Sequence, residues 1–204
     1  MIRIKLLAAV VMLSLSHVAW AQAGDWLVRV GGHNVNPKSD NNDLVEVEDA
    51  SQLTFDITYF MTNNWAVEVL AAIPFSHDIR IDGGPRVGET KHLPPTVSAQ
   101  YHFIPDGNIR PYVGLGVNYT IFFEEDTTGP LAGTDLELDS SIGLAAQVGV
   151  DFDIADNLFV NAVVRYIDIE SDAKVKNMPG VGILDVGNVE IDPFVFGLSL
   201  GMRF

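Results

Sequence analysis

The sequence predicts an all-β fold, an eight-stranded antiparallel transmembrane β-barrel with short periplasmic turns and longer extracellular loops. Three observations lead to this prediction. Apolar residues alternate with small or polar ones along eight segments, short connections alternate with long ones, and aromatic side chains lie near the segment ends. An even number of strands with apolar outward faces and aromatic girdles is typical of barrels in bacterial outer membranes.

The first 23 residues are expected to be a signal peptide, cleaved to leave residues 24–204 as the barrel. Two basic residues, Arg3 and Lys5, precede an apolar run over 6–20, and an A-x-A cleavage site ends at Ala23. The apolar run is shorter than the roughly 20 residues of a membrane-spanning helix, which disfavours an uncleaved anchor.

The mature chain is strongly acidic and contains no cysteine. Without the two basic residues of the signal peptide it has 10 basic and 27 acidic residues, a formal charge of −17. This charge argues against nucleic acid as a partner, because the phosphate backbone would be repelled. Without cysteine, the chain has no disulfide, no thiolate nucleophile and no cysteine ligand for a metal.

The alternation is clearest in the last segment, where Phe194, Phe196 and every second residue to Phe204 are apolar. Except for Val195, the residues between them are small or polar, so the apolar set is expected to face lipid and the other set the barrel interior. The same pattern, strong or weak, defines the eight segments 26–32, 53–61, 65–75, 93–103, 112–121, 141–154, 158–169 and 194–204.

A soluble β-sandwich would also alternate, but the connections and the aromatic residues favour the membrane barrel. Three connections are tight, with the sequences MTNN, IPDGNI and IADN. Longer and more acidic connections lie around residues 36–51, 80–91, 124–138 and 170–188. Trp26, Tyr59, Trp65 and Phe75 are among the aromatic residues near strand ends, where two interfacial girdles would lie.

Five stretches resemble the OmpW family of small outer-membrane barrels, which includes the AlkL-type proteins. They are VLAAIPFSH (69–77), KHLPPT (91–96), RPYVGLGVNYTIFFEE (110–125), RYIDI (165–169) and VEIDPFVFGLSLGMRF (189–204). The resemblance implies a bacterial outer-membrane barrel that helps small hydrophobic molecules across. It also implies a lumen closed toward the periplasm and a lateral exit into the bilayer. Some relatives are linked instead to small amino acids or to receptor roles.

The resemblance also implies the surroundings of the protein, which are outer-membrane lipid, lipopolysaccharide and the outer-membrane insertion machinery. Phe204 is the expected insertion signal, since that machinery is thought to read an aromatic C-terminus. Two alternatives to hydrophobic uptake stay open: a structural or receptor barrel without transport, and a channel for small amphipathic or amino-acid solutes.

The inward-facing residues predict a charged floor below an apolar upper lumen. With the tight turns at the periplasmic side, the lower plug would consist of Asp56, Glu68, Gln100, Asp151, Arg165 and Arg203. These charges are expected to pair, because an unpaired buried charge is costly. The upper lumen would be lined by Leu70, Phe122, Ile167 and Val195. Ordinary packing of a small closed barrel is the alternative interpretation.

Three prolines predict an interrupted seam between the third and fourth strands. Pro74 lies near the upper end of the third strand, and Pro94 and Pro95 lie near the upper end of the fourth. Proline has no N–H for the ladder, so these residues would weaken one seam above the plug and form a lateral opening. The alternative is that the prolines only end two strands.

No catalytic residues, cofactor or metal site are expected. Ser76 and His77 are neighbours in a strand and point to opposite faces, so they cannot easily share a proton. His102 is expected to be a polar member of the plug. The acidic stretches at 46–49 and 124–126 indicate solvated loop charge, which could meet lipopolysaccharide through bridging divalent cations.

Overall fold

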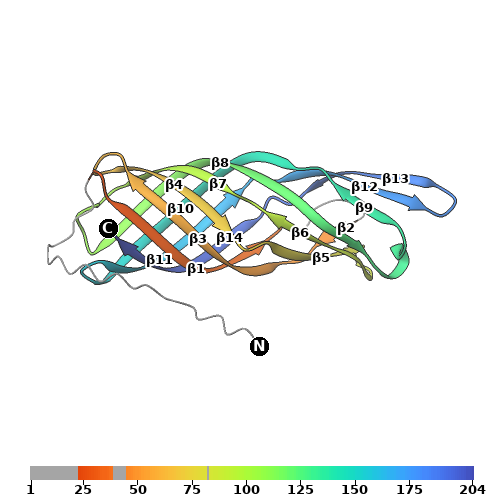
Figure 1. Cartoon of the computed structure of the whole chain (residues 1–204), viewed down its shortest axis with the longest axis horizontal. Helices are drawn as coiled ribbons and strands as arrows, with labels where there is room; N and C mark the ends of the chain where they lie inside the picture. The colour runs from red at the N-terminus through yellow and green to blue at the C-terminus, as the bar shows by residue number, and fades with distance from the viewer. Residues whose placement is uncertain (1–22, 39–44, 82) are drawn as a thin grey trace, which may run out of the picture.

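The computed structural model describes residues 23–38, 45–81 and 83–204, and the predicted signal peptide lies almost entirely outside them. Eight antiparallel strands close into a barrel, in which each pairs with the next and the last pairs with the first (Figure 1). They are β1 (Trp26–Asn36), β3 (Ala50–Phe60), β4 (Trp65–Ala72), β7 (Thr96–His102), β8 (Ile109–Thr127), β10 (Ser141–Ala155), β11 (Leu158–Ile167) and β14 (Phe194–Arg203). The predicted eight-stranded barrel is therefore confirmed.

The outer face of the barrel is apolar over its whole circumference. In β14 the side chains of Phe194, Leu200 and Met202 are about half exposed, whereas the alternate Val195 and Arg203 are buried. This is the arrangement that lipid outside and a filled lumen inside require. No helix among the described residues is long and apolar enough to cross a membrane.

Aromatic side chains mark the two membrane boundaries. At the end with the tight turns, the rings of Trp26 and Tyr59 lie 4.7 Å apart and those of Trp65 and Tyr101 lie 5.0 Å apart. At the other boundary, an upper girdle of Tyr119, Tyr166 and Phe194 is exposed on the outer face. Amphipathic rings at both interfaces fix the height of the barrel in the bilayer.

The long connections contain regular secondary structure of their own, which the sequence analysis did not anticipate. They contain six strands, β2 (Val45–Val47), β5 (Phe75–Ile81), β6 (Arg86–Leu93), β9 (Asp135–Leu138), β12 (Glu170–Met178) and β13 (Gly182–Glu190), and a short 3₁₀ helix, η1 (Gly129–Leu131). Strands β6, β5 and β2 continue the barrel sheet from β8, and β13, β12 and β9 form a second sheet. We call this set of elements the extracellular extension.

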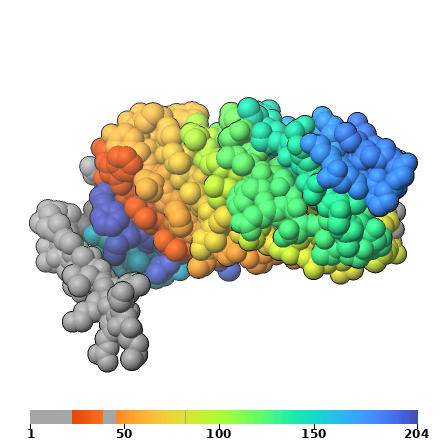
Figure 2. Space-filling view, turned by 45° about the vertical axis from the view of Figure 1, so that its right-hand side comes forward, coloured from red at the N-terminus to blue at the C-terminus, as the bar shows by residue number. Residues whose placement is uncertain are grey.

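The extracellular extension continues the long axis of the barrel at the end away from the C-terminus (Figure 1). In Figure 2 the blue β12–β13 hairpin forms the end farthest from β1, and the extension continues the body of the barrel without a break. Its core is a cluster of buried apolar side chains that also reaches into the upper barrel, including Phe75, Phe122, Ile169, Ala173 and Val189. The extension is thus packed onto the barrel rather than hinged from it.

Candidate functional site

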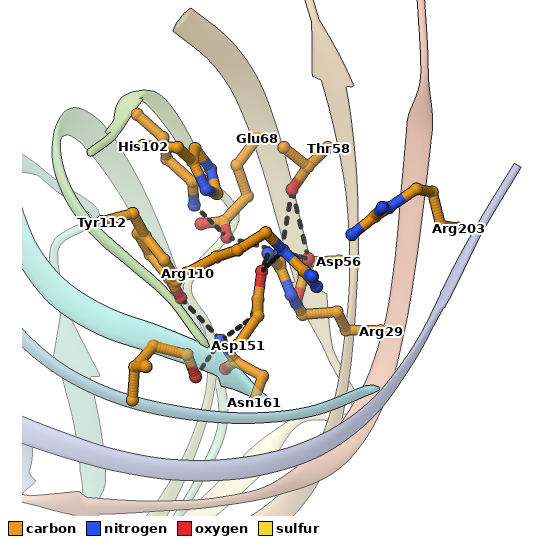
Figure 3. A network of polar contacts seen from close by, with 12 residues as sticks. Arg29, Asp56, Thr58, Glu68, His102, Arg110, Tyr112, Asp151, Asn161 and Arg203 are labelled. Atoms are coloured by element: carbon orange, nitrogen blue, oxygen red, sulfur yellow. Dashed lines mark hydrogen bonds and ion pairs between the residues drawn. The ribbon is translucent and has the colours of Figure 1, made fainter. Parts of the chain in front are cut away.

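The lower lumen is filled by a network of buried polar side chains (Figure 3). Arg29 from β1 lies at its centre. Its Nη1 donates to Asp56 Oδ1 at 2.7 Å and to Thr58 Oγ1 at 2.9 Å, and its Nη2 lies 3.3 Å from Asp151 Oδ2. One guanidinium therefore joins carboxylates from β3 and β10, two strands that lie on opposite sides of the barrel.

Glu68 from β4 is the second centre of the network, and its side chain is fully buried. It accepts hydrogen bonds from Gln100 Nε2 at 2.7 Å, Gln147 Nε2 at 3.1 Å and Arg165 Nη2 at 3.0 Å. Arg29 Nη1 lies 3.7 Å from the same carboxylate. Two arginines and two amides thus stabilise one buried negative charge, which is how a charge in a water-poor interior is tolerated.

A third group of residues lies closest to the tight turns. Arg110 Nη1 donates to Asp153 Oδ1 at 2.5 Å, and Arg203 Nη2 lies 3.9 Å from the same oxygen. Arg110 Nε also lies 4.0 Å from Asp151 Oδ2, which links this group to the centre, and Asn161 Nδ2 donates to Asp151 Oδ1 at 2.8 Å.

Tyr112 packs into the space that Gly149 leaves open. A Cβ at Gly149 would lie 2.4 Å from the hydroxyl oxygen of Tyr112, so only glycine permits this ring position. The ring of Tyr112 also stacks on His102 with 4.9 Å between centroids. His102 therefore lies within the plug, where the sequence suggested it.

All eight barrel strands contribute a buried side chain to this network, which we call the charged plug. The structure brings together all six residues predicted for the plug: Asp56, Glu68, Gln100, Asp151, Arg165 and Arg203. Among its other members, Arg110, Gln147 and Asn161 were not singled out from the sequence. Each lies on the inward face of its strand, and extending the alternation of 112–121 back by two residues would have found Arg110.

Two apolar cavities lie above the charged plug. The lower cavity, of about 20 Å³, is bounded below by Thr54 and Arg165 and is lined by three of the four predicted upper-lumen residues, Leu70, Ile167 and Val195. The upper cavity, of about 270 Å³, lies inside the extracellular extension and is lined by the fourth, Phe122. The sequence suggested one continuous apolar upper lumen, whereas the structure has two chambers.

A constriction separates the two chambers. His92 lines both of them, and its ring stacks on Phe75 with centroids 5.4 Å apart and on His77 at 4.8 Å. Ile191 lines the upper cavity and Val195 the lower one, and both belong to the buried core between them. A solute that passed from the upper to the lower chamber would have to displace these side chains.

The ladder between β4 and β7 stops where the three prolines lie. Its last pair is Leu70↔Thr96, and the first pair of the β5–β6 ladder above it is Phe75↔His92. Among the described residues, no ladder pair joins 71–74 to 93–95, the segments that hold Pro74, Pro94 and Pro95. We call this gap the seam.

The carbonyl groups at the seam are bonded away from it. Tyr119 N–H donates to the carbonyl of Pro95 at 3.0 Å, and Asn118 Nδ2 donates to that of Pro94 at 3.1 Å. Both donors come from β8, on the far side of β7 from β4. Because Pro94 also lines the lower cavity, the seam and that cavity share a wall.

The residues considered for catalysis and for metal binding have other partners. Ser76 Oγ donates to the carboxylate of Glu89, and His77 Nδ1 bonds to the backbone carbonyl of Glu48, so the two neighbours do not bond each other. Within the acidic stretches, Glu48 pairs with Arg80 and Glu124 pairs with a lysine. These contacts are typical of an exposed ion-paired surface.

Comparison with known proteins gives consistent results. The family model described as "OmpW family" matches residues 22–204. "Outer membrane protein W" of Vibrio cholerae is 42% identical over 213 residues, covering 97% of each chain. The crystal structure of the outer membrane protein OprG from Pseudomonas aeruginosa is similar with a TM-score of 0.85 and 32% identity, covering 91% of this chain and 98% of that one. "Dibenzothiophene metabolism operon protein PahQ" of Pseudomonas aeruginosa is 26% identical over 203 residues, covering 93% of each chain.

Proposed function

The chain belongs to the OmpW family of outer-membrane proteins, and on that premise we propose that it takes up small hydrophobic molecules through the extracellular extension and releases them sideways into the bilayer. A solute would enter the upper cavity, pass His92 into the lower cavity and leave through the seam. The charged plug would prevent it from continuing down the barrel axis.

One observation carries this proposal, the position of the seam. The lower cavity is bounded below by Arg165 of the charged plug and at the side by Pro94 of the seam. An apolar solute is not solvated by paired charges, but it is solvated by lipid. Of the two boundaries, the seam is therefore the favourable exit.

The name of one relative supports the class of solute. PahQ is named for an operon of dibenzothiophene metabolism, and dibenzothiophene is an apolar aromatic molecule. The upper cavity of this chain has a lining dominated by side chains such as Ile79, Val87, Leu136 and Val175. A lining of this kind suits a molecule with little or no charge.

Uptake can be tested in vesicles whose outer leaflet is lipopolysaccharide, which slows unassisted entry of hydrophobic molecules. The protein should accelerate entry of naphthalene, followed by its fluorescence, and leave entry of glycine unchanged. Acceleration of glycine alone would instead support a channel for amino-acid solutes.

We also propose that residues 1–23 are a cleaved signal peptide and that Phe204 serves as the signal for insertion. Phe204 is two-thirds exposed on the outer face, and its backbone exchanges hydrogen bonds with Trp26 at 2.9 and 3.0 Å. Its ring is therefore available to the insertion machinery, while its backbone helps to close the barrel.

A receptor role without transport is the second candidate, and the tip of the β12–β13 hairpin favours it. Val181 and Ile183 are each more than three-fifths exposed at the end of the extension farthest from the membrane. Exposed apolar side chains at such a position suit contact with another molecule. Absence of naphthalene uptake by a correctly inserted barrel would support this candidate.

A further inference from the structure

The upper cavity contains two histidines that have no obvious role in an apolar chamber. His77 and His92 are 2% and 3% exposed, and both line the cavity. Among the described residues, the Nε2 atom of each ring is buried without a hydrogen-bond partner. A buried polar atom without a partner is unfavourable, and this cost is relieved when a ligand supplies the missing bond.

The protonation of His77 follows from its one hydrogen bond. Nδ1 lies 2.5 Å from the backbone carbonyl oxygen of Glu48, and a carbonyl can only accept, so Nδ1 carries the hydrogen. In the neutral ring Nε2 is then an acceptor. Burial lowers the pKa of His77, and that of His92 to about 3, so both rings are neutral near pH 7. What His77 lacks is a donor.

The other polar side chains that line the cavity are already satisfied. Their hydroxyl groups donate to backbone carbonyl oxygens rather than to a solute, and they belong to Thr90, Thr127 and Ser171. Among the described residues that line the cavity, the buried side-chain nitrogen and oxygen atoms without a partner are thus His77 Nε2 and His92 Nε2.

On the basis of the proposed uptake function, we infer that the upper cavity is a binding site for hydrocarbons that carry one hydroxyl group, with the hydroxyl donating to His77 Nε2 and bonding to His92 beside it. Because its one hydrogen goes to His77, the hydroxyl bonds to His92 Nε2 as an acceptor, which requires the His92 tautomer that carries its hydrogen on Nε2. An alkane or an ether leaves His77 Nε2 without a donor.

The size of the cavity sets the length of the molecule. At roughly 30 Å³ for each water-sized unit, a volume of about 270 Å³ accommodates about nine non-hydrogen atoms. This corresponds to 1-octanol, and 1-methoxyheptane and nonane are matched in size. The ether accepts but does not donate, and nonane does neither, so the three molecules separate the contribution of the donor from that of the apolar chain.

His92 gives the site a direction. Because its ring lines both chambers, a hydroxyl bound beside it lies at the lower end of the upper cavity, near the constriction. The apolar chain then extends upward among side chains such as Ala173, Val175 and Leu184. The polar end of the solute is therefore the one that reaches the constriction first.

The test uses the mature protein, uniformly labelled with ¹⁵N, in lipid nanodiscs, with empty nanodiscs as the reference for partitioning. We expect 1-octanol to shift the Nε2 resonance of His77 saturably, and nonane and 1-methoxyheptane to leave it in place. In titrations followed by the amide signals of Ala173 and Val175, 1-octanol should bind about tenfold more tightly than the ether. His77→Phe should abolish this difference and retain nonane binding, and Tyr101→Phe, at the opposite end of the barrel, should change neither.

An unshifted Nε2 resonance in the presence of saturating 1-octanol would overturn the inference, and so would equal affinities for the alcohol and the ether. The wild-type measurement decides the matter even where His77→Phe does not fold. Octanol binding at His77 without accelerated uptake in vesicles would overturn the proposed transport function and leave the site standing. Accelerated uptake without a shift of the His77 resonance would overturn the binding site and leave the proposed transport function standing.

Discussion

Replacing Glu68 by alanine should both destabilise the barrel and open its floor to ions. The carboxylate accepts hydrogen bonds from Gln100, Gln147 and Arg165 and lies 3.7 Å from an Nη of Arg29. Without it, two arginines whose side chains are 1% and 2% exposed lose a counter-charge that water cannot replace. Removing one partner from a buried ion pair typically costs about 3–5 kcal/mol.

Comparing Glu68→Gln with Glu68→Ala separates the contribution of the charge to stability from that of the side-chain volume. Glu68→Gln keeps the volume and one acceptor oxygen, at the position of Oε1, for Gln147 and Arg165, but it places an amide NH₂ near the donors of Gln100 and Arg29. We expect it to lower the free energy of unfolding by about half as much as Glu68→Ala, since part of the hydrogen bonding survives. Glu68→Ala also leaves space, so it should give the larger ion conductance.

The assay combines urea unfolding in lipid vesicles with conductance in planar bilayers. Glu137→Ala is the matched control, because Glu137 pairs with Lys176 at 2.5 Å on the exposed extension, and its loss should leave both measurements unchanged. If Glu68→Ala unfolds like the wild type and conducts no more than it does, the charged plug neither stabilises the barrel nor closes it.

Three further outcomes are expected. Deleting Phe204 should reduce the amount of inserted barrel, measured by heat-modifiable mobility, before it alters uptake, and normal insertion would contradict its role as a signal. Pro94→Ala with Pro95→Ala should raise the unfolding midpoint slightly and reduce naphthalene entry, because restored N–H groups add about 0.5–1.5 kcal/mol each, and unchanged entry would argue against the seam. Lowering the pH from about 6.5 toward 3 should destabilise the extension, because burial lowers the pKa of His92 to about 3 while the unfolded residue binds a proton near 6.5. In His92→Phe the melting temperature should therefore depend less on pH over this range.

The structure also refines what is expected of the two prolines at positions 94 and 95. Tyr119 on β8 donates to the carbonyl of Pro95, and in a strand the N–H and C=O of one residue face the same neighbour. An N–H at position 95 would therefore face β8 rather than the seam. Pro95→Ala alone should have less effect on naphthalene entry than the double change.

The barrel and most of the charged plug could be predicted from the sequence because lipid and lumen impose opposite chemistry on alternate residues. Asp56, Glu68 and Asp151 stand out as charges on strands whose other faces are apolar. A charge at such a position can only face inward, where it must be paired. The pairing itself, such as the central place of Arg29, depends on distances across the barrel that the sequence does not contain.

The extracellular extension could not be predicted in the same way. In β13 every residue from Gly182 to Asp185 is exposed, so the two faces of this part show no contrast in burial. In β12 the buried Ala173 and Val175 alternate with charged residues, a pattern that the surrounding acidic residues obscure. The upper cavity and the unpaired nitrogens of His77 and His92 could not be predicted either, because they arise where β5 and β6 of the extension pack against β8 and β12.

The central claim, exit through the seam, is tested most directly by closing it with a cross-link. The chain has no cysteine, so Ile73→Cys with Leu93→Cys introduces a single pair across the seam, joined by a short thiol-reactive linker that a reductant cleaves. Val69→Cys with Val97→Cys is the control, since these residues face each other lower in the same two strands, where the ladder is already closed. We predict that linking 73 to 93 abolishes naphthalene entry, that reduction restores it, and that linking 69 to 97 has no effect. Full entry with the seam linked would contradict the account.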